Sequence, residues 1–175
     1  MPGFGTTDRT YQNAKELIRK TGATLREVSI KDACILHYKD IGHDAGNHDV
    51  TYENVQARER TQILMDIANQ ESGLVIGTGD LSELALGWCT YNGDHMSMYA
   101  VNTSIPKTLV RYLVEYEMQN NETLHDVLKS ILDTLISPQL LPPHKACKIL
   151  QKQDKYYSLY FALFYNIFLL FLFLT

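Results

Sequence analysis

The residues best suited to chemistry lie around a glycine-containing turn. Gly77, Thr78 and Gly79 predict a tight turn in which the backbone can approach a ligand closely. Asp80 and Glu83 follow with the spacing of a capping box, in which side chains bind the first free N–H groups of a helix. This pattern fits either a ligand site or an ordinary capped strand-to-helix junction, and the local pattern leaves both open.

Lys107 is a second candidate because it falls in the first turn of a helix that starts at Pro106. A lysine at this position opposes the helix dipole unless an anion offsets its charge. A phosphate group is therefore a reasonable partner for Lys107. The alternative is a lysine exposed to solvent.

Residues 31 to 50 combine three histidines with three aspartates: His37, His43, His48, Asp40, Asp44 and Asp49. Their spacing matches no established zinc signature. Ligands on an irregular loop that contains glycine would also not be held in place. The segment is therefore interpreted as a mobile, solvated loop rather than a metal site.

The turn itself is expected to join a strand to a helix. Residues 74 to 76 form a short apolar run, typical of a parallel strand buried on both faces. The helix that follows is expected to bury Leu81, Leu84 and Ala85. Such a junction lies at the carboxyl end of a strand, where α/β sheets bind ligands. Residues 96 to 101 can form a short strand or an extended loop.

Other elements follow from caps and apolar periodicity. We expect one helix from Thr7 or Asp8 to Thr21, then a strand at 23–30, and a second helix from Asp49 or Thr51 to about Gln70. A third helix is expected from Pro106 onward. A fourth is expected from about Glu122 to Ile136, capped by Asn121 or Thr123. The first half of the second helix is polar, with Asn54, Gln56 and Arg58. It is either a solvated face or one wall of a cleft.

Composition narrows the class of protein. The 175 residues are 45% hydrophobic, which suits one compact domain. A net charge of -4, with no run of lysine or arginine, argues against a nucleic-acid surface. Cys34, Cys89 and Cys147 are widely spaced and form no CxxC pair, so neither a disulfide framework nor a zinc knuckle is indicated. With no apolar leader at the amino terminus, a cytoplasmic location is expected.

The last part of the chain has a different composition. Four lysines precede residues 156 to 174, an almost uncharged run that is just long enough to span a bilayer. Ser158, Asn166 and several tyrosines make it a poor membrane span. The favoured interpretation is an altered reading frame or a non-native terminus, and a tail anchor is the second choice.

Four long motifs resemble the synthetase domain of the NAD+ synthetase family and occur in the same order as in that family. They are MPGFGTTDRT, DVTYENVQARERTQILMDIAN, LVIGTGDLSELALGWCTYNGD and MSMYAVNTSIPKTLVRYLV. The resemblance is closest to the family's glutamine-dependent branch. The resemblance covers residues 1–143 and leaves 144–175 as a divergent apolar tail. It implies an α/β fold, a doubly wound parallel sheet of the ATP pyrophosphatase (adenine nucleotide alpha hydrolase-like) type, incomplete here, and a homodimer.

The resemblance also implies a reaction, the amidation of deamido-NAD+ to NAD+ in NAD biosynthesis. ATP with Mg2+ adenylates the nicotinate carboxylate, and ammonia derived from glutamine then displaces AMP. The roles carried over are ATP binding for Thr78 and Lys107, a catalytic role for Lys107 and Asp94, Mg2+ or deamido-NAD+ binding for Glu83, and deamido-NAD+ binding for Asn54, Arg58, Trp88, Cys89, Thr90 and Tyr91.

Two departures from the family pattern predict impaired activity. The family's phosphate-binding loop, a Ser-Gly-Gly signature ending in Asp-Ser, occurs nowhere in the chain and is expected before Met1. The carboxyl end diverges after residue 143, where the family has a segment that closes over substrate. The amidase domain is also expected to be missing, so no cysteine is assigned as a nucleophile. The alternative function is a non-catalytic dinucleotide-binding or dimerisation fragment, which could pair with an intact subunit or be held at a membrane by its tail.

Overall fold

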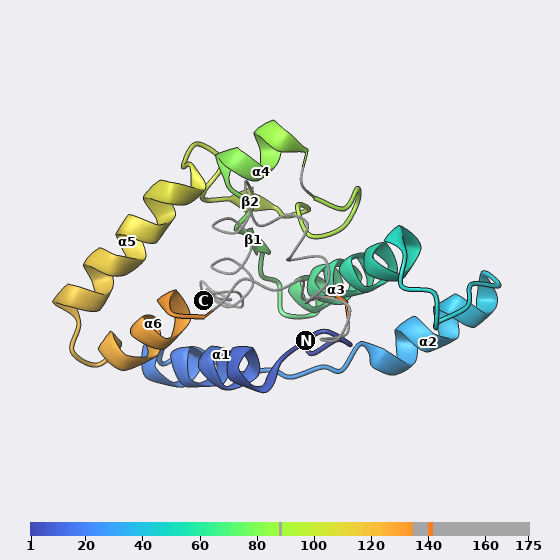
Figure 1. Cartoon of the computed structure of the whole chain (residues 1–175), viewed down its shortest axis with the longest axis horizontal. Helices are drawn as coiled ribbons and strands as arrows, with labels where there is room; N and C mark the ends of the chain where they lie inside the picture. Colours follow the sequence, from blue (N-terminus) through green and yellow to red (C-terminus); the bar gives the residue numbers. More distant parts are fainter. Residues whose placement is uncertain (88, 135–139, 142–175) are drawn as a thin grey trace.

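The computed structural model describes residues 1–87, 89–134 and 140–141. Within these ranges, six helices are arranged around a two-stranded parallel sheet (Figure 1). The elements are α1 (Asp8–Thr21), α2 (Lys31–Asp40), α3 (Val50–Gln70), β1 (Ile76–Gly77), α4 (Leu81–Leu86), β2 (Tyr99–Ala100), α5 (Lys107–Asn120) and α6 (His125–Leu132). Trp88, the expected helix end near residue 136 and the apolar run at 156–174 lie outside the described residues.

Local capping signals set the ends of α1 and α3. The Thr7 side chain accepts a hydrogen bond from the Thr10 N–H, and Gly22 ends α1 in the left-handed region at φ 74°. Asp49 accepts hydrogen bonds from the N–H groups of Thr51 and Tyr52 at the start of α3. The predicted bounds of these two helices are therefore confirmed.

The two strands are short and parallel. Ile76 pairs with Tyr99, and Gly77 pairs with Ala100. Val75 is buried, whereas Leu74 is 37% exposed, so the apolar run at 74–76 is only partly the buried strand that we expected. The connection between the strands passes through α4, which places the glycine turn at the carboxyl end of β1.

Two apolar clusters hold the helices together. One joins α1, α5 and α6 through Leu17, Val110, Val127, Leu128 and Ile131. The other joins α2 and α3 through Ile30, Cys34, Tyr38, Tyr52 and Val55, with Leu141 from the carboxyl side. The sheet and the glycine turn lie between these two helical groups (Figure 1).

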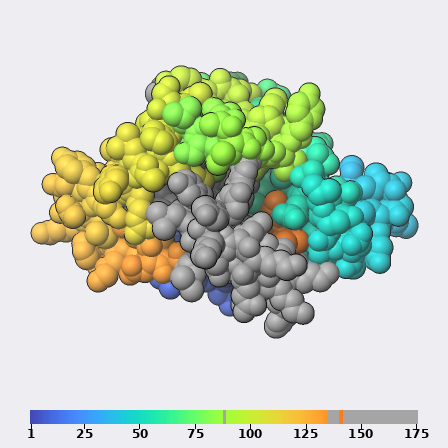
Figure 2. Space-filling view, turned by 45° about the horizontal axis from the view of Figure 1, so that its top comes forward, coloured from blue at the N-terminus to red at the C-terminus, as the bar shows by residue number. Residues whose placement is uncertain are grey.

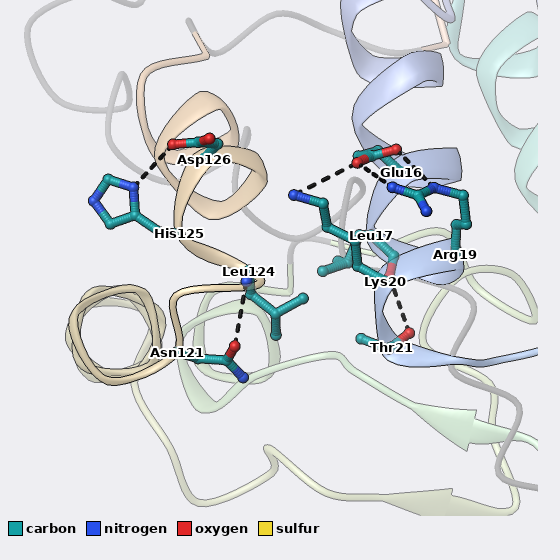
Figure 3. Close-up of polar contacts among 9 residues, drawn as sticks. All are labelled: Glu16, Leu17, Arg19, Lys20, Thr21, Asn121, Leu124, His125 and Asp126. Atoms are coloured by element: carbon teal, nitrogen blue, oxygen red, sulfur yellow. Dashed lines mark hydrogen bonds and ion pairs between the residues drawn. The ribbon is translucent and has the colours of Figure 1, made fainter.

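Helix α6 starts later than its sequence pattern predicts. The Asn121 side chain accepts a 3.3 Å hydrogen bond from the Leu124 N–H and closes a turn before the helix (Figure 3). The helix begins at His125, whose Nδ1 lies 3.0 Å from Asp126 Oδ1. On the neighbouring α1, Glu16 forms ion pairs with Arg19 and Lys20.

The expectations for residues 23–50 are partly wrong. Residues 23–30 form no strand: the sheet in the described part of the chain consists of β1 and β2, and no backbone ladder joins it to residues 23–30. The segment expected to be a loop contains α2, since Cys34 and Tyr38, one helical turn apart, are both buried against α3. The Tyr38 hydroxyl also donates a 2.8 Å hydrogen bond to the Tyr52 carbonyl.

Helix α4 does not bury the side chains that we expected. Leu81 and Leu84 are 43% and 46% exposed, and Ala85 is also exposed. The helix has only six residues and is held by polar contacts at its first turn, so its apolar side chains stay on the surface of the described structure (Figure 2). None of the described helices is long and apolar enough to cross a membrane.

Candidate functional site

The glycine turn is fixed by the capping box at the start of α4. Asp80 Oδ1 accepts a 2.9 Å hydrogen bond from the Glu83 N–H. In return, the Asp80 N–H donates a 3.3 Å hydrogen bond to Glu83 Oε2. The capping box predicted from the sequence is confirmed, and it sets the positions of both carboxylates.

Lys107 is buried beside these carboxylates. Its side chain is 5% exposed, and Nζ lies 2.7 Å from Glu83 Oε1 and 3.5 Å from Asp80 Oδ2. The solvent-exposed alternative is therefore wrong. The anions that offset this lysine at a helix start are the carboxylates of Asp80, the N-cap of α4, and of Glu83 in its first turn.

Three hydrogen bonds hold the start of α5 against the turn. The Lys107 N–H donates to Ser82 Oγ at 3.2 Å, and the Leu81 N–H donates to the Ile105 carbonyl at 3.1 Å. The Asn102 side-chain amide donates to the Thr78 carbonyl at 3.4 Å. The two motifs that carry Thr78 and Lys107 are thus one structural unit.

Burial raises the pKa of the Glu83 carboxyl above the ordinary value, while the neighbouring Lys107 ammonium lowers it in part. The Lys107 ammonium, 2.7 Å from Glu83 Oε1, favours the carboxylate form of Glu83. Two carboxylates around one ammonium leave an excess of negative charge. A divalent cation would offset that charge with hard oxygen ligands.

A second polar group surrounds Thr90. Its hydroxyl donates a 2.7 Å hydrogen bond to Asn54 Oδ1 on α3, and its N–H donates to Asp94 Oδ1 at 2.8 Å. His95 Nδ1 lies 2.7 Å from the Thr90 carbonyl. Predicted residues from two motifs, Asn54, Thr90 and Asp94, therefore meet in space.

A cavity of about 230 Å3 runs from α1 to the glycine turn. The site residues along it are Thr78, Glu83, Cys89 and Asp94, and most of its remaining wall comes from α1, α3 and β1. Burial is the main cause that raises the pKa of the Cys89 thiol, with the charges of Asp94 and Glu83 as smaller causes. The cavity thus connects the two polar groups.

Other predicted residues stay apart from this arrangement. Arg58 is exposed on α3 and is not part of the cavity wall. Tyr91 is 79% exposed, and its ring centroid lies 6.5 Å from that of His95. Gln56 is fully buried and accepts a hydrogen bond from the Phe4 N–H while donating to the Leu140 carbonyl, so it ties core segments together. The prediction that Gln56 lies on a solvated face or a cleft wall is wrong, because its side chain is fully buried.

Two residues of the site are not predicted from the sequence. The spacing predicts only a capping role for Asp80, but its second oxygen also faces Lys107. No sequence pattern points to His95, which contacts Thr90 and lines the cavity. Because a buried lysine needs a counter-ion, the burial of Lys107 implies a nearby carboxylate such as that of Asp80. The spacing of residues in the sequence does not reveal that Lys107 is buried.

The histidines of residues 31–50 are distributed over separate contacts. His43 Nε2 lies 3.0 Å from Asp49 Oδ1, and the His48 ring packs on Tyr52. No group of three or more His, Cys, Asp or Glu side chains within the described residues is arranged to hold a metal ion.

Known proteins share both sequence and structure with the chain. The NAD synthase family model matches residues 1–132. A glutamine-dependent NAD(+) synthetase from Mycobacterium leprae is 50% identical over 150 residues, covering 81% of this chain and 22% of the relative. A glutamine-dependent NAD(+) synthetase from Acinetobacter baylyi is 35% identical over 125 residues, covering 70% of this chain and 23% of the relative.

Solved structures agree with these relatives. A glutamine-dependent NAD+ synthetase from Acinetobacter baumannii, solved with ADP, superposes with a TM-score of 0.69 at 31% identity, covering 87% of this chain and 28% of that one. An NMN synthetase from Francisella tularensis gives 0.68 at 26% identity, covering 81% and 56%. The chain spans about a fifth of the length of the M. leprae relative. The fold is thus part of an α/β fold of the ATP pyrophosphatase type.

Proposed function

Because the chain belongs to the NAD synthase family, we propose that it provides the substrate-facing part of a site that converts deamido-NAD+ to NAD+. The family consists of ligases that form a carbon–nitrogen bond. The observation that supports the proposal most strongly is the ion pair between Lys107 and Glu83, at the end of β1 and beside the cavity.

The proposed reaction has two steps. The nicotinate carboxylate attacks the α-phosphorus of ATP, and the bond to the bridging oxygen breaks to release pyrophosphate. Ammonia then attacks the acyl carbon of the adenylate, loses a proton and displaces AMP. Both steps develop charge on phosphate oxygens, so fixed cations and backbone donors lower their barriers.

Residue roles follow from position and charge. Thr78 and Lys107 would bind ATP, with Lys107 neutralising phosphate oxygens and acting as a catalytic group. Asp94 would act near the reacting groups, as a wall of the cavity. Asn54, Cys89, Thr90 and the more exposed Tyr91 would bind deamido-NAD+. Arg58 and Trp88 complete the set of residues proposed to bind deamido-NAD+.

Glu83 would hold Mg2+ or the deamido-NAD+ end of the site. Its carboxylate is a hard oxygen donor in a cluster with excess negative charge, which fits the group that Mg2+ prefers. When bound, the ion would neutralise phosphate charge. Lys107, released from Glu83, would then be available to the phosphates.

Residues 1–143 are proposed as the synthetase part and 144–175 as a separate tail. We also propose a cytoplasmic homodimer, or pairing with an intact subunit. Large apolar side chains on the outer face of α5 support pairing, since such faces mark interaction surfaces. They are Leu109, Tyr112, Leu113 and Tyr116. Light scattering that finds only monomers of this chain at all concentrations would refute the homodimer.

The test of the proposed function measures NAD+ formation from deamido-NAD+, ATP, Mg2+ and ammonia by the purified chain. The 175 residues contain no Ser-Gly-Gly signature. We therefore expect turnover far below that of a full-length relative, together with measurable binding of deamido-NAD+ by titration calorimetry. Binding without turnover would favour the second candidate, a non-catalytic dinucleotide-binding or dimerisation fragment. Absence of both would refute the proposed function.

A further inference from the structure

The two oxygens of Asp80 have different surroundings. Oδ1 accepts the 2.9 Å hydrogen bond from the Glu83 N–H and is fixed by the capping box. Oδ2 is buried, accepts no hydrogen bond from the part of the chain that the structure describes, and lies 3.5 Å from Lys107 Nζ. The Asp80 side chain is 0% exposed. Its orientation is therefore set by backbone, and its second oxygen points at the ammonium.

The Glu83 carboxylate is held less tightly than that of Asp80. It remains 23% exposed and lines the cavity, so solvent or a ligand can reach it. Its 2.7 Å contact with Lys107 Nζ is nevertheless the shorter of the two ion pairs. A ligand that recruits Glu83 would remove this contact, and the buried Lys107 ammonium would still face Asp80 Oδ2.

We propose that Asp80 is a positioning residue that holds the Lys107 ammonium at the end of β1 when Glu83 is drawn to a ligand. Asp80 Oδ2 already lies within ion-pair distance, so a small shift of Nζ gives it a hydrogen bond. Because Oδ1 stays bound to the Glu83 N–H, Asp80 cannot follow the ligand. Lys107 thus keeps a fixed counter-ion while it turns to phosphate oxygens.

The role of Asp80 in phosphate binding rests on the proposed function. Its ability to hold Lys107 when the Glu83 contact is lost does not. The first experiment therefore uses the 175-residue chain without any ligand. Lysines are acetylated with a water-soluble succinimidyl acetate, and the rate at each lysine is followed by peptide mass spectrometry. The variants are Glu83→Gln, Asp80→Asn and the double variant. Asparagine is a good N-cap and glutamine keeps the capping box, so both substitutions preserve local structure while removing charge.

With Glu83→Gln alone, we expect Lys107 to react within about threefold of its rate in the unsubstituted chain, because Asp80 still holds it. In the double variant, we expect at least tenfold faster acetylation of Lys107. The exposed Lys31 and Lys129 are internal references and should not change. Full reactivity of Lys107 after Glu83→Gln alone, or no further gain in the double variant, would overturn the proposal.

A stability cycle covers the case in which Asp80→Asn alone fails to fold. Lys107→Met should lower Tm because it leaves the buried Asp80 carboxylate without its cation. Adding Asp80→Asn to Lys107→Met should recover at least half of the lost Tm. A double variant no more stable than Lys107→Met would show that the two side chains are not coupled, and would overturn the proposal.

Titration of the same variants with ATP and Mg2+ separates this inference from the proposed function. Loss of ATP affinity in Asp80→Asn, with deamido-NAD+ affinity kept within about twofold, is expected. No ATP binding by the unsubstituted chain would count against the proposed function and leave the ligand-free results to decide the role of Asp80. Unchanged ATP affinity in Asp80→Asn would overturn the phosphate-binding part of the inference.

Discussion

The Thr90 hydroxyl donates a 2.7 Å hydrogen bond to Asn54 Oδ1, although the two residues are 36 positions apart in the chain. This bond joins α3 to the loop after α4 and orients two side chains proposed to bind deamido-NAD+. The Asp94 carboxylate and the His95 ring hold the backbone of Thr90 on either side. Thr90 therefore links the helix to the cavity wall.

Replacing Thr90 by valine keeps its shape and removes the donor. We expect deamido-NAD+ to bind about tenfold more weakly, equivalent to about 1.4 kcal/mol, because Asn54 loses its fixed orientation. Thr90→Ser keeps the hydroxyl and should bind within about threefold of the unsubstituted chain. Titration calorimetry measures both, and equal weakening by the two substitutions would contradict the role of the hydrogen bond.

Gly77 is needed because β1 passes close to the Ser97 side chain. A Cβ at Gly77 would overlap Ser97 Oγ and Cβ. We expect Gly77→Ala to destabilise the chain by about 1–3 kcal/mol, as overpacking does. Gly79→Ala is the matched control, since among the described residues its added Cβ would meet only Glu83 Oε2, at 3.7 Å.

Urea denaturation measures both glycine variants. The Gly79→Ala variant should unfold within about 0.5 kcal/mol of the unsubstituted chain, as substitutions without a specific clash do. The clash at Gly77 is confirmed if adding Ser97→Gly restores stability to Gly77→Ala. No recovery in that double variant would assign the loss to another cause.

The Cys89 thiol should react slowly with iodoacetamide at neutral pH. Burial, with the Asp94 charge as a smaller cause, raises its pKa above the ordinary value and lowers the fraction of reactive thiolate. Asp94→Asn removes one of these causes and should move the pH–rate profile to lower pH. Cys34, whose pKa is raised to about 11 mainly by burial, is the internal control because Asp94 is not among the causes of its shift.

Peptide mass spectrometry resolves the cysteines in this experiment. Saturating deamido-NAD+ should slow the alkylation of Cys89 at least fivefold and leave Cys34 unchanged. An unshifted profile after Asp94→Asn would contradict the electrostatic account. Equal protection of both cysteines would point to global stabilisation instead of a ligand beside Cys89.

The apolar cluster between α2 and α3 extends to residues 140–141. Leu141 is 3% exposed in the cluster with Tyr38 and Tyr52, and the Leu140 carbonyl accepts a 2.8 Å hydrogen bond from Gln56 Nε2. We expect Leu141→Ala to cost about 2–5 kcal/mol, whereas Leu36→Ala, at a side chain that is 58% exposed, should cost under about 0.5 kcal/mol. Thermal unfolding monitored by circular dichroism measures both.

A chain that ends at residue 143 tests the proposed domain boundary directly. It should unfold at the same temperature as the 175-residue chain if the tail is a separate part. A chain that ends at residue 139 should be destabilised to a degree similar to Leu141→Ala. Equal stability of the two shorter chains would contradict the core role of Leu141.

Local signals in the sequence predicted the parts of the fold that depend on neighbouring residues. The caps at Thr7, Asp49 and Asp80, and the helix end at Gly22, all form as their side chains and spacing indicate. The charge at Lys107 was also recognised as needing an anion. Each of these features is decided within one or two turns of backbone.

Features that depend on distant partners were missed. Residues 23–30 have strand-like composition, but a strand exists only when another strand offers hydrogen bonds. Helix α2 depends on burying Cys34 and Tyr38 against α3, which its own pattern does not reveal. The placement of Asp80 beside Lys107, 27 positions later in the numbering, likewise depends on how α5 docks on α4.

The parallel pairing of β1 with β2 has a consequence for how this part of the chain opens. Bringing Ile76 and Tyr99 together closes a loop of roughly 20 residues, which costs about 3 kcal/mol of chain entropy. The few ladder bonds, such as Val101 N–H to the Gly77 carbonyl, repay little of that cost. The strands must therefore form together with the contacts that link Leu81 to Ile105 and Lys107 to Glu83. Hydrogen exchange should give the same opening free energy for the amides of Leu81 and Val101. The strands and the proposed site would then form and unfold together.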